Sequence, residues 1–172
     1  ALFHTGVWIK NFALHHLATQ TNGLAVNLVV DNDIRSNSSI RVPVGDRRHP
    51  RFASIPFDDF TLQEPWEESQ VGNRAVFDSF GHRVEQAMAA WSVRPVLTEI
   101  WPDVISRANQ SSRLADCLTA GRSLLEKRWG LRNLELPISR MCTVDPFLWF
   151  AGHLFAHAEQ FRDLHNNVLR EF

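Results

Sequence analysis

The sequence predicts an α/β protein in which a partial parallel sheet is followed by a mostly helical region. A helical pattern opens at Phe3-His4-Thr5-Gly6, and after an Asn22-Gly23 turn an apolar run over residues 25–30 ends at Asp31-Asn32-Asp33. That order is the second half of a strand–helix–strand crossover, the unit that builds parallel sheets and places ligands at the carboxyl ends of strands. From about residue 74 onward the apolar residues recur with a helical period instead.

The first 60 residues form the predicted partial α/β unit. The strand over residues 25–30 is apolar on both faces apart from Asn27, which is typical of a central, covered strand. Short strands are also predicted at residues 38–44 and 52–57, where prolines favour strand ends or edges. Residues 61–73 are acidic and contain a proline and a glycine, so they are the predicted linker.

Residues 74–172 are predicted to be mainly helical, with one strand near residues 133–140. The apolar spacing predicts helical segments at about 76–91, 96–108, 112–129, 147–158 and 161–172. Pro102 leaves open whether the second of these is one kinked helix or two short ones. The segment 147–158 is apolar almost all round, so we expect it to be buried.

Composition narrows the class of protein. The chain has 172 residues and a formal net charge of −1, which favours a single soluble domain over a nucleic-acid-binding protein. No apolar run is long enough for a membrane span, and Cys117 and Cys142 lack metal-type spacing, which is typical of a reduced, cytoplasmic protein. We also expect a piece of a longer protein, because no strand precedes the first helix and the last helical pattern is still in register at Phe172.

The beginning of the first helix carries a candidate phosphate site. The amino end of a helix exposes unpaired N–H groups and a partial positive charge, which together accept a phosphate. Gly6 permits close approach of the backbone, Thr5 adds a hydroxyl donor, and His4 can protonate or hydrogen-bond a phosphoryl oxygen. Lys10 lies one turn after Gly6 on the same face, so its ammonium group can reach back to the amino end of the helix. The alternative is a helix that starts with Thr-Gly and carries one solvated lysine.

A second candidate site follows the apolar strand. Asp31 and Asp33 can hold a divalent cation that bridges phosphates, and Arg35 can bind a phosphate oxygen. The alternative is that these residues only form a turn, since Asp and Asn are common turn formers. Adjacent parallel strands would bring His4 and Asp31 to one rim of the sheet, and this shared rim favours a functional site.

Three histidines, His153, His157 and His165, lie in the last helical segments. Residues at i and i+4 share a helix face, and such a pair can bind zinc, which would fit a metal-dependent hydrolase if a third ligand faced both. However, Leu154 stands where the zinc-hydrolase pattern has a glutamate. The aromatic neighbours favour packed core histidines instead.

Two segments carry a resemblance to a known family. Phe3-His4-Thr5-Gly6-Val7-Trp8 and Leu28-Val29-Val30-Asp31-Asn32-Asp33 resemble the bacillithiol-forming cysteine ligase-like proteins and, more remotely, nucleotidylyltransferase-type folds. The first is similar to the segment after their Gly-His/Gln-Gln turn, and the second to their second strand and its acidic end. The resemblance implies a Rossmann-like nucleotide site near these residues, a nucleoside triphosphate with magnesium as ligand, and a helical insertion or second domain.

The leading hypothesis is a cytoplasmic enzyme that binds a nucleotide or a phosphorylated small molecule and either transfers a nucleotidyl group or joins two small molecules. Its expected catalytic residues are His4, Lys10, Asp31 and Asp33, its phosphate-binding residues are His4, Thr5, Gly6 and Arg35, and its metal ligands are Asp31 and Asp33. The alternative is a non-catalytic binding or interaction module on an α/β scaffold. Chemistry requires an exposed polar rim, whereas a scaffold would bury or cap those groups.

Overall fold

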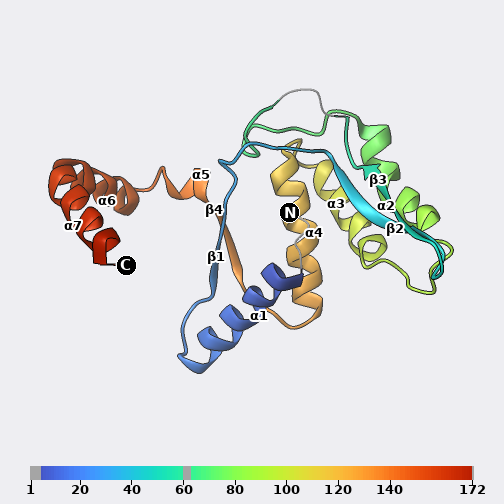
Figure 1. The fold of residues 1–172 in the computed structure, drawn as a ribbon, viewed down its shortest axis with the longest axis horizontal. Coiled ribbons are helices and arrows are strands. Elements are labelled where there is room, and N and C mark those ends of the chain that lie inside the picture. Colours follow the sequence, from blue (N-terminus) through green and yellow to red (C-terminus); the bar gives the residue numbers. More distant parts are fainter. Residues whose placement is uncertain (1–4, 60–62, 172) are drawn as a thin grey trace.

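The computed structural model describes residues 5–59 and 63–171 (Figure 1). The helices are α1 (Thr5–Gln20), α2 (Arg74–Ala87), α3 (Leu97–Ala108), α4 (Leu114–Arg128), α5 (Ile138–Met141), α6 (Asp145–Ala156) and α7 (Ala158–Glu171). The strands are β1 (Val26–Val29), β2 (Ser39–Gly45), β3 (Pro50–Pro56) and β4 (Leu134–Pro137). The chain is therefore a mixed α/β protein, and this part of the predicted fold class is confirmed.

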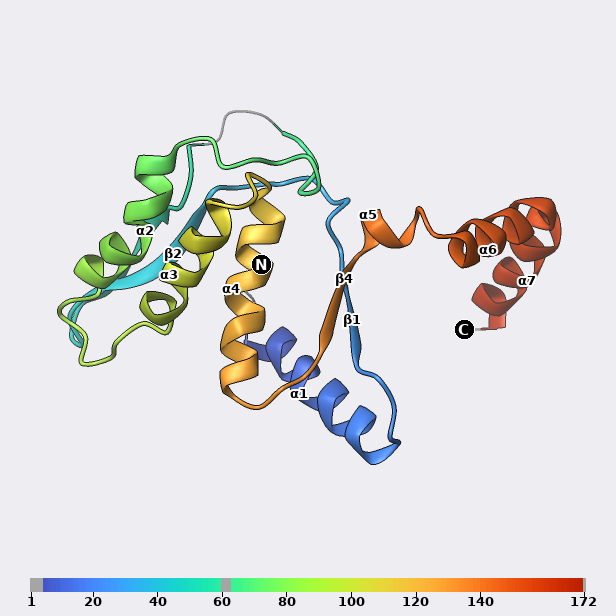
Figure 2. The same cartoon turned by 180° about the vertical axis from the view of Figure 1, so that it is seen from behind.

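The strand predicted over residues 25–30 is present as β1, but its parallel partner lies far along the chain and α1 precedes both strands, so the expected strand–helix–strand crossover through α1 is not seen in the described residues. β1 pairs in parallel with β4, with Val26 opposite Leu134 and Val29 opposite Pro137. Within residues 5–59 and 63–171 this parallel sheet has two strands, so a full Rossmann-like sheet is not seen. The prediction of a central, covered strand is wrong, because Val26, Leu28 and Val30 are exposed. Helix α4 lies on one side of the strand pair (Figure 2), and Leu134 of β4 is exposed as well.

The two short strands predicted before residue 60 are confirmed as an antiparallel hairpin of β2 and β3. Its turn depends on Gly45, whose φ of +82° lies in the left-handed region. The carboxylate of Asp46 then accepts the backbone N–H groups of Arg48 and His49, at 2.7 Å and 2.8 Å. These bonds close the turn and set the strand register.

The hydrophobic core lies between the hairpin and helices α2, α3 and α4. Phe77 and Phe80 of α2 pack on the ring of Trp101, with ring centroids 4.9 Å and 4.6 Å apart. The indole N–H of Trp101 donates to the carbonyl oxygen of Phe77 at 2.7 Å, so the buried polar atom is satisfied. The residues around Pro102 form one continuous helix, α3, which decides between the two alternatives left by the sequence.

The segment predicted as a linker is bound to the rest of the chain over its described residues. The buried carboxylate of Asp58 accepts the backbone N–H groups of Gly72 and Asn73, at about 3 Å. The backbone N–H of Glu67 donates to the carbonyl oxygen of Asp31 at 2.7 Å. Residues 63–73 therefore connect the end of β1 to the start of α2 through hydrogen bonds on both sides.

Helices α6 and α7 form an arm, defined as residues 145–171, that projects away from the rest of the molecule (Figures 1 and 2). No residue of either helix is buried. The prediction that the apolar segment 147–158 is buried is therefore wrong, because α6 meets little of the described chain other than α7. No helix within the described residues is both long enough and apolar enough to span a lipid bilayer.

Cys117 gives a direct test of the core. Burial, and secondarily the charge of Asp116, raises the pKa of its thiol to about 11. Because the thiolate is the reactive form, only about one thiol in a thousand is ionised at pH 8. We expect iodoacetamide at pH 8 to label the half-buried Cys142 in the native protein, and Cys117 only after denaturation. Peptide mass spectrometry measures both rates, and equal native rates would contradict the packing of α4.

Candidate functional site

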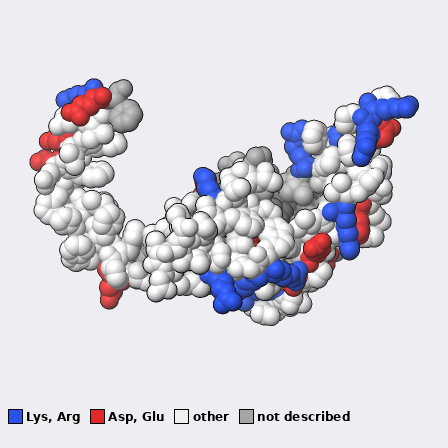
Figure 3. Space-filling view, turned by 90° about the horizontal axis from the view of Figure 1, so that it is seen from below, with Lys and Arg blue, Asp and Glu red and all other residues white. Residues whose placement is uncertain are grey.

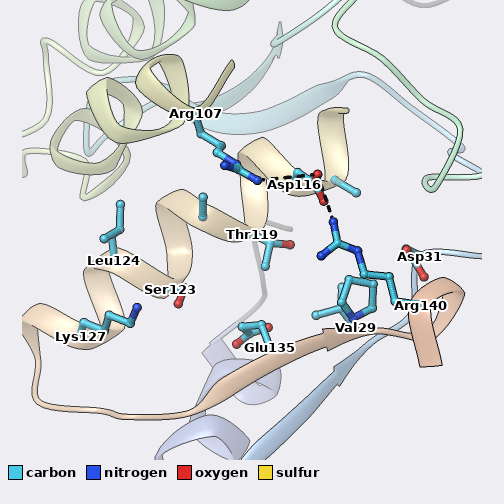
Figure 4. Close-up of a pocket in the computed structure, with 13 residues that line it drawn as sticks. Val29, Asp31, Arg107, Asp116, Thr119, Ser123, Leu124, Lys127, Glu135 and Arg140 are labelled. Atoms are coloured by element: carbon cyan, nitrogen blue, oxygen red, sulfur yellow. Dashed lines mark ion pairs between the residues drawn. The ribbon is translucent and has the colours of Figure 1, made fainter. Parts of the chain in front are cut away.

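A pocket of about 340 Å³ lies between α4 and the inner face of the β1–β4 pair (Figure 4). Its volume is at the lower end of the range for small-molecule sites, roughly 300–1,000 Å³. The strands contribute Val29 and Glu135 to its wall, and Asp31 lines it just beyond β1. The pocket therefore includes the carboxyl ends of two parallel strands, where α/β proteins bind their ligands.

The α4 wall of the pocket is a polar stripe. Asp116, Thr119, Ser123 and Lys127 follow one another at intervals of three or four residues, so they share one face of the helix. The opposite face of α4 carries Leu118, Leu125 and other core residues. Burial of the apolar face against α3 thus turns the polar face toward the strands.

The charges in the pocket are only loosely paired. Asp116 lies between two arginines, with its Oδ2 atom 4.0 Å from Arg107 and 3.9 Å from Arg140 (Figure 4). Ion pairs of that length with exposed arginines contribute little to stability. Lys127 is exposed and forms no ion pair with any described residue. These three cations are therefore available to an anionic ligand at little energetic cost.

Beneath the pocket lies a buried ionic network centred on Arg122. The guanidinium donates to Glu126 of α4 at 2.8 Å and to Glu135 of β4 at 2.5 Å. Burial opposes the charged form, but the hydrogen bond and charge of Glu135, followed by those of Glu126, hold the pKa of Arg122 above its ordinary value. Trp8 and Asn11 of α1 donate to Glu126 at 2.6 Å and 2.7 Å. The network fixes Glu135 in the pocket wall and ties α1 to α4.

Asp31 lies at the edge of the pocket, but its carboxylate is already hydrogen-bonded to another residue of the protein. Only 2% of Asp31 is exposed, and its two oxygens accept the backbone N–H and the hydroxyl of Ser139, at 2.9 Å and 2.5 Å. Asp31 therefore holds the start of α5. Asp33 is exposed, and its Oδ1 atom accepts the N–H of Ile34 at 2.9 Å, as in a turn.

Arg35 lies apart from these two carboxylates. It is buried and pairs with Asp58 at 3.3 Å and with Glu64 at 3.7 Å. Its ion pairs are therefore with Asp58 and Glu64 rather than with the acids of the Asp31–Asp33 turn.

The first helix begins near where the sequence predicted it. Thr5 and Gly6 form its first residues and are exposed, as is Lys10. His4, which was expected to complete this phosphate site, lies outside the described residues. The predicted convergence of His4 with Asp31 and Asp33 stays a prediction.

The predicted metal sites gain no further ligands. Within residues 5–59 and 63–171, no three His, Cys, Asp or Glu side chains are grouped so that they could hold a metal ion. The rings of His153 in α6 and His157 just after that helix are tilted relative to each other, with centroids 4.4 Å apart, and both residues are exposed rather than packed in a core. Nδ1 of His157 lies 2.9 Å from the carbonyl oxygen of His153. Among the described residues, no third ligand of the kind that a zinc hydrolase needs is grouped with them.

Several pocket residues were missed by the sequence analysis. Arg107 is far in the chain from Glu135 and Arg140, and no local pattern marks any of the three. The polar stripe of α4 is visible as a pattern, but an exposed helix face looks the same in a sequence. No protein-family model, curated protein or solved structure matches the chain.

Proposed function

We propose that the protein binds a small phosphate-bearing ligand, such as a nucleotide, in the pocket between α4 and the β1–β4 pair. The observation that carries this proposal is the combination of loosely paired cations with a hydroxyl-bearing helix face. Arg107, Lys127 and Arg140 supply positive charge, and Thr119 and Ser123 supply hydrogen-bond donors. Arginine and lysine are the side chains that bind phosphate oxygens most effectively.

The acids in the pocket favour a ligand with both anionic and donor groups. Asp116 and Glu135 line the same pocket as the three cations. A nucleotide fits this pattern, because its phosphates would meet the cations and its hydroxyl or amino groups would meet the carboxylates. Magnesium would enter mainly with the phosphates, as is usual when a protein offers one or two carboxylates.

The reaction that we propose is nucleotidyl transfer or ligation of two small molecules by a cytoplasmic enzyme with a Rossmann-like sheet. It is supported by the helix-then-strand order of α1 and β1, by their parallel partner β4, and by the position of the pocket at the strand ends. Within this proposal His4, Lys10 and Asp33 contribute to the reaction, whereas Asp31, whose carboxylate accepts from Ser139, positions the start of α5 at the edge of the pocket.

Isothermal titration calorimetry tests the binding step. We expect at least one of ATP, GTP, CTP and UTP with magnesium to bind, and Lys127→Ala or Arg140→Ala to weaken binding about tenfold or more, since a hydrogen bond to a charged group contributes about 1.5–3 kcal/mol. Arg162→Ala, which removes the same charge from the arm, is the matched control. Failure of every nucleotide to bind, or equal weakening by the control, would rule the proposal out.

A non-catalytic interaction module remains the second candidate. The observation that favours it is the bare apolar surface of the arm, which has no role in a small-molecule site. A protein that binds none of the nucleotides yet self-associates through the arm would support this alternative.

A further inference from the structure

The arm exposes an unusual amount of apolar surface. Most of its large apolar side chains are exposed: Leu148, Trp149, Phe150, Phe155, Phe161, Leu164, Val168 and Leu169. Trp149 is 73% exposed and Phe155 is 81% exposed. Figure 3 shows most of the arm without Lys, Arg, Asp or Glu on the face in view, with charged side chains gathered near its far end.

The two helices of the arm cover little of each other. In α6 only Phe147, Ala151 and Leu154 are half-buried, and their spacing places them on one face. The remaining apolar residues of α6 point away from that face. Isolated helices of 12 and 14 residues have only marginal stability in water without tertiary packing. We therefore expect another protein surface to pack against the exposed apolar side chains of the arm.

A second bare apolar surface lies on the outer face of the β1–β4 pair, which we define as Val26, Leu28, Val30 and Leu134. All four are exposed, from 39% for Val26 to 59% for Val30. Parallel sheets are normally covered on both faces, but here α4 lies on the inner face only. The outer face is therefore an apolar sheet surface that lacks its usual helical layer.

We propose that two copies of the chain exchange their arms, so that the arm of each copy covers the outer face of the other copy's β1–β4 pair. Each copy carries both the donor and the acceptor surface, so a twofold axis makes the two contacts identical. Helices then lie on both faces of each sheet, which is the usual arrangement in α/β proteins. The proposal concerns the outer face and is independent of the ligand in the pocket.

The available area is sufficient for a stable dimer. The eight exposed side chains of the arm present on the order of 900 Å² of apolar surface, taking about 200 Å² for each large side chain. Such a patch exceeds the roughly 300–600 Å² that a typical monomer exposes. The outer face offers about 390 Å² by the same measure, so covering that area on both partners in each of two reciprocal contacts would bury about 1,600 Å² in total, which lies within the roughly 1,200–2,000 Å² of stable interfaces.

Geometry and charge favour a second copy over other occupants. The arm leaves β4 through α5 and stands clear of its own sheet, so the sheet of another molecule is accessible to it (Figures 1 and 2). The arm carries four acidic side chains against two basic ones, whereas helices that lie on membrane surfaces are rich in Lys and Arg. Exchange of an identical element between protomers is a low-cost route to a dimer.

Sedimentation velocity of the intact chain at micromolar concentration tests the proposal. We expect a species of twice the 19.7 kDa monomer mass. Leu28→Asp on the sheet and Phe155→Asp on the arm should each raise the dimer dissociation constant about tenfold or more, because each places a charge in both contacts. Phe52→Asp, a change at a 65% exposed phenylalanine of β3, is the matched control and should leave the dimer intact.

Mixing the two variants distinguishes a dimer formed by arm-to-sheet contacts from a dimer formed through other surfaces. The intact arm of the Leu28→Asp chain can still cover the intact sheet of the Phe155→Asp chain, so the mixture should form a heterodimer that neither variant forms alone. Far-UV circular dichroism checks that each variant folds, and Leu164→Asp replaces any arm variant that does not. A monomeric native chain, a dimer unaffected by Leu28→Asp, absence of the heterodimer, or flotation of the chain with lipid vesicles instead would each overturn the proposal.

Discussion

Replacing Arg122 with methionine should lower the free energy of unfolding by about 3–5 kcal/mol. The change leaves Glu126 and Glu135 without the cation that both of them contact, and Glu126 is almost fully buried. An uncompensated buried charge costs far more than the loss of the side chain's apolar contacts. Urea denaturation followed by tryptophan fluorescence measures the loss as a lower midpoint at an unchanged slope.

Arg128→Met is the matched control for this prediction. Arg128 lies on the same helix, but its side chain is half exposed and its partner, Asp103, is at the surface. Removal of an exposed pair should cost no more than about 1 kcal/mol. Adding Glu126→Gln to the Arg122→Met variant should restore part of the loss, because the amide still accepts from Trp8 and Asn11 without a charge. Equal losses for the two arginine variants would show that the network does not stabilise the fold.

A second large effect is expected at Gly121. A Cβ atom at this position would lie 2.3 Å from Cγ2 of Val104, so the packing of α4 against α3 leaves no room for a side chain at Gly121. Gly121→Leu should therefore lower the free energy of unfolding by about 3 kcal/mol, or prevent folding, since overpacking outweighs the gain of at most ~1 kcal/mol in helix propensity. Thermal unfolding followed by circular dichroism measures it.

Gly152→Leu provides the control, because a side chain at this position in α6 meets open space. The same exchange there should leave stability unchanged or raise it slightly. A double-mutant cycle of Gly121→Ala with Val104→Ala adds a further check: the pair should be better tolerated than the sum of the single changes. Additive losses would mean that the two residues do not contact each other.

Local patterns predicted most of the secondary structure, for identifiable reasons. In α2 the apolar residues Phe77, Phe80 and Val84 recur at helical spacing, and they form the face that the structure buries. The helix predicted at about residues 112–129 is α4, and Gly130, directly after its end, has a φ of +88°, a conformation that glycine favours. The predicted start is close as well, since α4 begins at Leu114.

Functional residues were harder to predict than helices. The acidic end of β1 was recognised as a strand end, but the partner of Asp31 is Ser139, which lies 108 residues later in the chain. Arg35 likewise pairs with Asp58 rather than with the neighbouring acids. A sequence shows which groups can form hydrogen bonds, whereas the choice of partner depends on which segments pack together.

From the amino-acid order alone came most of the helices, the two strands of the hairpin, the helix-then-strand order of α1 and β1 and the acidic strand end, because each depends on side-chain periodicity and turn residues within a few positions. Only the tertiary structure showed the parallel partner of β1, the pocket along α4, the buried Arg122 network and the exposure of the arm. Each of these joins residues far apart in the chain or reflects a missing neighbour. The apolar pattern of α6 is the same whether a core, a partner or solvent lies against it, so only the arrangement in space could show that the arm is bare.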